Sequence, residues 1–370
     1  MPVLEKAGLR EGASFLASIM TNAAALTALQ SLNATNKSLE QTQSRISTGY
    51  RVSEASDNAA YWSIATTMRS DNQALSTVQD ALGLGASKVD TAYTGMNNAL
   101  DTIGKIKTKL LSTVGQTDAA KAKTQTEITA LQAQMKSFAD AATFSGSNFL
   151  SVTSKQVSVA NDGVQADAQI VSSFNRSSSG AISLGTINID IESTKLFDNG
   201  LATAVKNQGT LDRQTSVYAT AADQAKYDTA YANALAGGAT DIAANTAGQT
   251  AAVTTVGRID NVSAYNLDIT AAGITDDIIT QMVGKIDKVM SQLTDSATIL
   301  GAAKSSIDLQ KTFTQSLMDS IDRGVGQLVD ADMNKESTRL QALQVQQQLG
   351  IQSLSIANSS SQSILSLFKN

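Results

Sequence analysis

Two short segments carry residue types whose spacing could support chemistry. Gly83-Leu84-Gly85-Ala86-Ser87-Lys88 resembles a phosphate-binding loop in outline, because its glycines precede a lysine. It lacks the Gly-Lys-Ser/Thr ending of such loops and falls inside a long helical pattern, so we interpret its small residues as room for a neighbouring helix. Asp330 and Asp332 could form a carboxylate pair, but their position near a helix start favours capping and helix-dipole roles.

Two residue types that often perform side-chain catalysis, Cys and His, are absent. The 370 residues include no Cys and no His, which excludes disulfides, thiolate nucleophiles, Cys/His zinc sites and imidazole bases. The net charge of −5 gives no basic surface for nucleic acid. There is no apolar run of transmembrane length, and the N-terminus lacks the apolar core of a cleaved signal peptide. We therefore expect no enzyme, no cofactor, no metal, no nucleic-acid partner and no membrane insertion.

The composition favours long helices packed closely together. Hydrophobic residues reach 42%, but aromatic residues only 4%, and the sole proline is Pro2. A large compact globule usually contains more aromatic side chains, because they bury the most area each. Without interior prolines, every later segment can be a continuous helix or strand. We therefore expect an elongated, mainly helical chain.

Both ends of the chain have the pattern of a coiled-coil seam. From about Ser18 to Ser47, apolar side chains at Leu32, Leu39 and Ile46 recur every seven residues. From about Gly326 to Asn370 the apolar steps are three and four residues. The predicted seam positions are Ile19, Leu26, Leu29, Leu32, Leu39 and Ile46 at one end, and Val345, Leu349, Ile351, Leu354, Ile356, Leu365 and Phe368 at the other.

Two interpretations of these ends remain open. Either they form a hairpin within one chain, or they pair and also pack on neighbouring copies. Polar side chains inside the seams favour the second, because they cost stability but specify register and partners. These are Asn22, Asn36, Gln43, Asn358 and Ser361. Arg45 and Arg51 flank the break at Ser47-Thr48-Gly49 and are either solvated or form salt bridges between copies.

Three longer helices are expected inside these ends. One begins at the capping residues Ser56-Asp57 and runs to about Val114, which is about 55 residues. Trp62 is expected as a buried anchor near its start. A second covers Asp118 to Ala141 and folds back antiparallel, and a third runs from Thr275-Asp276 to about Gly324.

The middle of the chain, from about Phe144 to Thr270, changes to Ser, Thr, Asn, Gly and Val. Ile187, Ile189 and Ile191 alternate with polar residues and predict a strand, and Val157 with Val159 suggests another. The tract Ala219–Ala247 predicts some helix, broken at Gly237-Gly238. The predicted fold is therefore mainly α: a long antiparallel helical rod with terminal coiled-coil helices, plus a smaller α+β domain inserted in the middle.

Several motifs resemble those of bacterial flagellins. At the N-terminal end they are Ser18-Ile19-Met20-Thr21-Asn22, Arg45-Ile46-Ser47-Thr48-Gly49-Tyr50-Arg51-Val52-Ser53 and Ala55-Ser56-Asp57-Asn58-Ala59-Ala60. Further along they are Phe144-Ser145-Gly146-Ser147-Asn148-Phe149-Leu150, Asp330-Ala331-Asp332 and Ser363-Ile364-Leu365-Ser366-Leu367-Phe368. The run Tyr61-Trp62-Ser63-Ile64-Ala65-Thr66-Thr67-Met68-Arg69 is similar to flagellins of alphaproteobacteria such as rhizobia.

The resemblance implies a structural subunit that polymerises into the helical flagellar filament used for swimming, outside the cell. It implies an inner coiled-coil tube from residues 18–47 and 326–370, a spoke at 48–56, and a rod from 57–150 and 275–324. Residues 151–274 would form a variable surface domain. Residues 1–17 precede the usual start of the family, and we expect them to be a disordered extension or the product of a misassigned start codon. The interface is expected at the seam residues above with Asn36, Arg45 and Arg51.

The resemblance also implies partners. They are the chain itself, a flagellar export chaperone, and the filament cap and hook-junction proteins, with secretion through the flagellar type III apparatus. An alternative within the same superfamily is a hook–filament junction protein.

Overall fold

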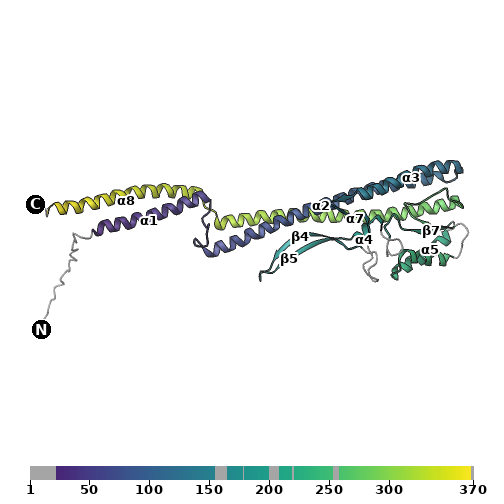
Figure 1. The fold of residues 1–370 in the computed structure, drawn as a ribbon, viewed down its shortest axis with the longest axis horizontal. Helices are drawn as coiled ribbons and strands as arrows, with labels where there is room; N and C mark the ends of the chain where they lie inside the picture. Colours follow the sequence, from purple (N-terminus) through teal and green to yellow (C-terminus); the bar gives the residue numbers. More distant parts are fainter. Residues whose placement is uncertain are drawn as a thin grey trace, which may run out of the picture. The chain divides into compact units, whose positions relative to one another are not determined.

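The computed structural model describes residues 22–154, 165–177, 179–199, 208–218, 221–252 and 258–367 (Figure 1). The expected disorder of residues 1–17, the expected strand at Val157 and Val159, and the seam positions Ile19 and Phe368 lie outside these residues. The described chain forms two compact units. The terminal unit extends to Asn72 and resumes at Asp319, and the central unit is Gln73–Met318.

In the terminal unit, α1 (Ala23–Thr48) pairs with α8 (Met333–Leu367). Helix α1 starts where the Asn22 side chain accepts a hydrogen bond from the Ala25 amide, 2.9 Å away. It ends at Gly49, whose φ of 77° is the left-handed conformation that glycine adopts without steric cost. Helix α8 starts where the Asp332 carboxylate accepts from the amides of Asn334 and Lys335, which confirms the predicted capping role of Asp332.

The segment after α1 is tied by its backbone to the end of α7 (Asp276–Val329). The amides of Arg51 and Val52 donate to the Val329 carbonyl at 2.6 and 3.2 Å, and the Ala331 amide donates to the Gly49 carbonyl at 2.9 Å. Val52 is buried in a small core with Ala65, Val325 and Val329. This part of the chain is therefore fixed on both sides of the break between helices.

The central unit is built on α7, on α3 (Asp118–Ala141) and on α2 (Ala59–Thr113), whose first residues belong to the terminal unit. Figure 1 shows α3 running back alongside α2, as expected from the short link between them. Ion pairs join the three helices at Lys109–Glu127, Lys107–Asp287 and Lys121–Asp276. Their shared core is fully buried at apolar positions three or four residues apart, among them Leu82, Val89, Met96, Ile103, Ile128, Met135, Met282, Ile286 and Leu293.

In the described part of the segment between α3 and α7, the strands form two-stranded pairs. Strands β1 (Thr143–Phe144) and β2 (Ser147–Asn148) form a hairpin whose turn residues, Ser145 and Gly146, both have positive φ. Strand β4 (Ala168–Arg176) pairs antiparallel with β5 (Ile182–Ile189). Strand β7 (Thr215–Tyr218) pairs antiparallel with β8 (Arg258–Val262), whereas β3 (Ser151–Val152) and β6 (Phe197–Asp198) are parallel.

The described residues of the middle also form the helices α4 (Ile191–Thr194), α5 (Ala221–Ala236) and α6 (Asp241–Ala252). The predicted helix break at Gly237-Gly238 is confirmed, and Gly238 has a φ of 83°. The predicted strand is confirmed through Ile189 but wrong at Ile191, which begins α4. The Asp190 side chain accepts from the Ser193 amide there and so caps a helix start.

Other predicted boundaries are close, with two corrections. Helix α3 has the predicted bounds, and α2 has 55 residues. Its cap is Asn58 rather than Ser56-Asp57, because the Tyr61 amide donates to the Asn58 side chain. Helix α7 continues past Gly324 and Gly326 to Val329, so its predicted end at about Gly324 is wrong. Gly324 and Gly326 together cost the helix about 2 kcal/mol, less than burial of Val325 and Val329 contributes at about 1.5–3 kcal/mol for each side chain.

Candidate assembly surface on the terminal helices

A heptad seam joins α1 and α8. On α1 the less exposed positions step by three and four residues: Ala25, Ala28, Leu32, Thr35, Leu39, Thr42 and Ile46. On α8 they do the same: Glu336, Leu340, Leu343, Gln347, Gly350, Leu354 and Ala357. This alternation is the signature of two helices that pack along one stripe each.

Three side-chain contacts define the register of the pair. Asn22 Nδ2 donates to the Ala357 carbonyl at 2.9 Å, and Gln347 Nε2 donates to Asn36 Oδ1 at 2.7 Å. Near the other end of the pair, Arg45 Nη1 lies 3.4 Å from Glu336 Oε1. Residue numbers rise on α1 as they fall on α8, so the helices are antiparallel. Asn22, Asn36 and Arg45 therefore have partners inside one chain.

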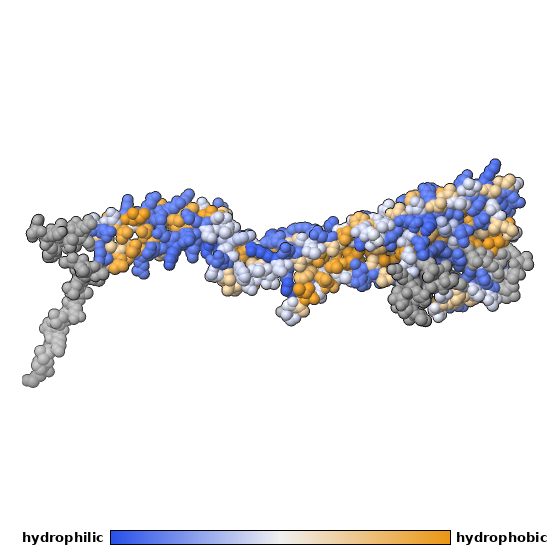
Figure 2. Space-filling view, in the orientation of Figure 1, coloured by the Kyte–Doolittle hydropathy of each residue, from blue (hydrophilic) through white to orange (hydrophobic). Residues whose placement is uncertain are grey.

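A second apolar stripe lies on the outer face of α8. Val345, Leu349 and Ile356 are 55%, 59% and 68% exposed, and their spacing of four and seven residues aligns them on one helix face. That face is opposite the seam that contains Leu343 and Leu354. Figure 2 shows hydrophobic side chains gathered on the visible surface of the α1–α8 pair. Exposed apolar side chains aligned on one helix face form a candidate interaction surface.

The structure thus separates the predicted seam positions into two groups. Leu32, Leu39, Ile46 and Leu354 lie in the intramolecular seam. Leu26, Leu29, Val345, Leu349, Ile351 and Ile356 are exposed. Leu365 lies in α8, in a part of the helix where side chains are not described. The pattern of threes and fours identified apolar helix faces, but it did not distinguish the face that pairs within the chain from the face that stays exposed.

Aromatic and charged side chains cluster beside the break after α1. The Arg51 guanidinium donates to the Leu328 carbonyl at 2.8 Å, and that of Arg69 lies 4.7 Å from the centre of the Tyr50 ring. Trp62 is 38% exposed, so its predicted role as a buried anchor is wrong. The Asp57 carboxylate accepts hydrogen bonds from the backbone amides of Ser53 and Glu54. The hydrogen bond from the Ser53 amide is the main cause that lowers the pKa of Asp57.

The segment that resembles a phosphate loop is helical throughout. It lies in the middle of α2, and the small size of Gly85 makes room for the Ile170 side chain of β4 rather than for the neighbouring helix that we predicted. Within the described residues, no group of three or more acidic side chains is placed to hold a metal ion. No helix in the same residues is long and apolar enough to cross a bilayer.

A buried cluster of charged side chains also lies in the central unit. Lys195, 1% exposed, pairs with Asp198 at 2.9 Å and with Glu192 at 3.0 Å. Asp212 accepts a hydrogen bond from the Asp198 amide at 2.9 Å. Burial, with added repulsion from Asp198, raises the pKa of Asp212 to about 6. Lys195 offsets one of the carboxylate charges, and these contacts hold α4, β6 and the loop after β6 together.

Comparisons with known proteins agree with these features. The family model of the bacterial flagellin N-terminal helical region matches residues 19–155, and that of the bacterial flagellin C-terminal helical region matches residues 283–368. The chain is 47% identical to Flagellin C of Rhizobium meliloti (strain 1021), over 96% of this chain and all of that protein. It is 44% identical to a flagellin of Brucella melitensis biotype 1, with the same coverage of both chains. The chain belongs to the bacterial flagellin family.

Proposed function

We propose that this chain is the structural subunit of a bacterial flagellar filament and that it polymerises through the exposed apolar surface of the α1–α8 pair. The observation that carries the proposal is the outer stripe Val345, Leu349 and Ile356, which has no cover within the described chain. Covering each half-exposed side chain with another copy would contribute about 1 kcal/mol. When every subunit buries these side chains against the next copy, the summed contribution stabilises a polymer.

The geometry of such a polymer follows from its interfaces. An outer stripe that meets a different surface of the next copy makes a head-to-tail contact, and repeated contacts of this type build an open helix. The ends of the chain would form the inner tube (residues 18–47 and 326–370), with residues 48–56 as a spoke. Residues 57–150 and 275–324 would form the rod, and residues 151–274 would face the surroundings.

The proposed role is structural and extracellular. The lack of His and Cys across the sequence supports a subunit without catalysis. An export chaperone, the filament cap and the hook-junction proteins are the proposed partners besides the chain itself. Export would use the flagellar type III apparatus, and the absence of Cys supports passage as an unfolded chain that needs no oxidation afterwards.

Complementation tests the proposal. The full chain is expressed in a bacterium whose own flagellin genes are deleted, and cells are examined by electron microscopy and by swimming in soft agar. The expected result is long helical filaments and restored swimming. A short stub of this protein at the hook end, without filaments, would contradict the proposal and favour a junction protein instead.

A further inference from the structure

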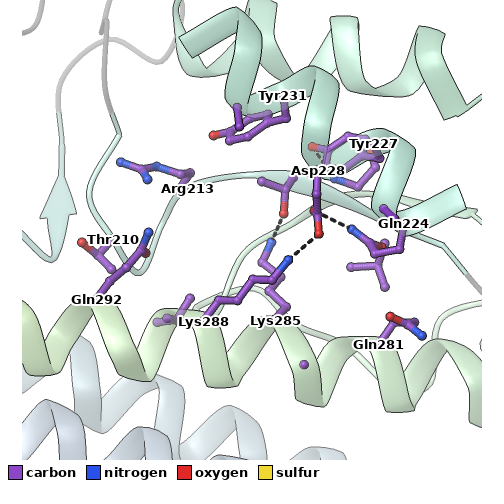
Figure 3. Close-up of a pocket in the computed structure, with 17 residues that line it drawn as sticks. Thr210, Arg213, Gln224, Tyr227, Asp228, Tyr231, Gln281, Lys285, Lys288 and Gln292 are labelled. Atoms are coloured by element: carbon purple, nitrogen blue, oxygen red, sulfur yellow. Dashed lines mark hydrogen bonds and ion pairs between the residues drawn. The ribbon is translucent and has the colours of Figure 1, made fainter. Parts of the chain in front are cut away.

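The central unit contains a cavity of about 520 Å³ between α5 and α7 (Figure 3). In Figure 3, Lys285 and Lys288 rise from α7 on one side, and Tyr227, Asp228 and Tyr231 descend from α5 on the other. Arg213, from the loop before β7, closes the third side. The volume lies in the range of pockets that hold small ligands.

Cations outnumber carboxylates on the wall of this cavity. Arg213, Lys285 and Lys288 line it, whereas Asp228 is its one acidic lining residue among those described. Asp228 is already paired, because it accepts from Lys288 and, at 3.0 Å, from the Gln224 amide. The positive excess favours an anionic ligand.

The nearest other carboxylate belongs to Asp241, and it is also engaged. It lies 3.5 Å from Arg213 Nε and accepts from the Tyr231 hydroxyl at 2.9 Å. The Arg213 Nε atom is buried, and its Nη2 atom donates to the Gln208 carbonyl at 3.4 Å. The Nη1 atom makes no hydrogen bond in the described residues, so it is the part of the guanidinium that remains for an anionic group in the cavity.

Lys285 has no acidic partner among the described residues. Its ammonium donates to the Thr215 hydroxyl and to the Val262 carbonyl, which are both neutral. Burial is the main cause that lowers its pKa to about 7, and Arg213 and Lys288 lower it further, while Asp228 opposes them. An anion placed among these groups would restore the charge on Lys285, so binding near neutral pH would take up a proton.

The rest of the wall is suited to hydroxyl groups. The amides of Gln281 and Gln292 project from α7, and neither makes a hydrogen bond within the described chain. Opposite them, the rings of Tyr227 and Tyr231 stack with centres 5.8 Å apart. Gly284 lies between the two glutamines on α7 and leaves that side of the cavity open, because a Cβ atom there would meet nothing within 4 Å.

We propose that this cavity binds a small polyhydroxylated anion, a sugar acid or sugar phosphate, with its anionic group among Arg213, Lys285 and Lys288 and its hydroxyls on Gln292, one helical turn beyond Lys288. The proposal concerns the monomer and does not depend on filament assembly.

Titration calorimetry on the full-length monomer tests it, with glucuronate and glucose 6-phosphate as probes. Both should bind, and glucose and inorganic phosphate should each bind at least about tenfold more weakly, because each lacks one half of the recognised chemistry. If glucose binds as tightly as glucuronate, the role of the cations is wrong. If phosphate matches glucose 6-phosphate, or if neither probe binds, the proposed ligand class is wrong.

Two variants locate the site. Gly284→Leu places a side chain in the cavity at a helix position where a Cβ atom meets nothing within 4 Å. It should therefore abolish binding, while the far-ultraviolet circular dichroism of the protein stays unchanged. Gly104→Leu on α2, where a Cβ also meets nothing within 4 Å, is the matched control and should bind normally. Equal binding by both variants would overturn the assignment of the cavity.

Proton uptake tests the placement of the anion. Calorimetry of the wild type at pH 7.5, in two buffers with different ionisation enthalpies, should show a fraction of a proton bound with each probe. Lys285→Met should remove that uptake and weaken binding about tenfold. Wild-type binding without proton uptake would contradict the position of the anionic group beside Lys285.

Discussion

Arg45 on α1 forms an ion pair with Glu336 on α8, although the two residues are 291 positions apart in the sequence. The Glu336 side chain is only 8% exposed, whereas that of Arg45 is 28% exposed. The second carboxylate oxygen of Glu336 is buried without a hydrogen bond in the described residues. The carboxylate therefore depends on Arg45, and the pair helps to hold the antiparallel register of the terminal helices.

Replacing Arg45 with Ala should destabilise the α1–α8 pair by about 1–3 kcal/mol, because a buried carboxylate loses its cation. The measurement is thermal disassembly of filaments followed by light scattering. Lys37→Gln, which removes the same charge from an exposed position on α1, should leave the midpoint unchanged. The double variant Arg45→Ala/Glu336→Gln should recover much of the loss. Equal midpoints for Arg45→Ala and the wild type would contradict this role.

Two glycines of α2, two positions apart, should respond in opposite directions. A Cβ at Gly85 would lie 2.5 Å from the Ile170 side chain, whereas a Cβ at Gly83 would meet nothing within 4 Å. Gly85→Ala should therefore lower the free energy of unfolding by about 1–3 kcal/mol through overpacking. Gly83→Ala should raise it by about 0.5–1 kcal/mol, because alanine favours the helix.

Urea unfolding of the monomer measures both changes. Combining Gly85→Ala with Ile170→Val should restore part of the stability, because valine lacks the terminal methyl group that isoleucine places in this contact. If Gly85→Ala were as stable as Gly83→Ala, the close approach of β4 to α2 would be wrong.

Asp212 should make the central unit less stable at neutral pH than at acid pH. Its pKa in the folded chain is raised to about 6 from 3.8, so folding favours the protonated form. That stabilisation is present below pH 3.8 and is lost as the pH rises through 6. Asp212→Asn, which keeps an oxygen acceptor for the Asp198 amide, should therefore stabilise the protein above pH 6 by at most about 3 kcal/mol.

Urea unfolding at pH 4 and pH 7.5 checks this prediction. The difference between Asp212→Asn and the wild type should be small at pH 4 and largest at pH 7.5. Asp80→Asn, at an exposed position of α2, is the control and should show no such dependence. A gain in stability that is the same at both pH values would mean that the charge of Asp212 is not the cause.

The helices were predictable because the apolar residues that pack on one helix face recur every three or four positions in the sequence. Leu32, Leu39 and Ile46 recur every seven residues, and they lie in the seam. Leu26 and Leu29 belong to the same helix, but their spacing from the seam leaves them exposed. One helix pattern alone does not reveal where its partner lies, so the two apolar faces of α8 could not be told apart.

Features that depend on distant contacts were not predictable. The parallel pairing of Ser151 with Phe197 joins segments that carry no local strand signal. Lys285 resembles an exposed helix lysine in the sequence, but its ammonium is buried against Thr215 of β7 and Val262 of β8. Trp62 was predicted to be buried from its residue type, but its position on the helix leaves it partly exposed.

The outer stripe of α8 is the centre of the proposed function, and an acidic residue within it should block assembly. In Leu349→Asp, a charge replaces a side chain that is 59% exposed in the single chain and is proposed to be covered in the polymer. Burying that unpaired charge between copies would cost several kcal/mol. Ser355→Asp places the same charge on α8 outside both the seam and the stripe, and it is the matched control.

Seeded growth of filaments from purified monomer, followed by electron microscopy, is the most direct test of this surface. Leu349→Asp should keep the helix content of the wild-type monomer by circular dichroism yet fail to extend seeds, while Ser355→Asp should extend them normally. Growth of Leu349→Asp at the wild-type rate would contradict the account of how this chain assembles.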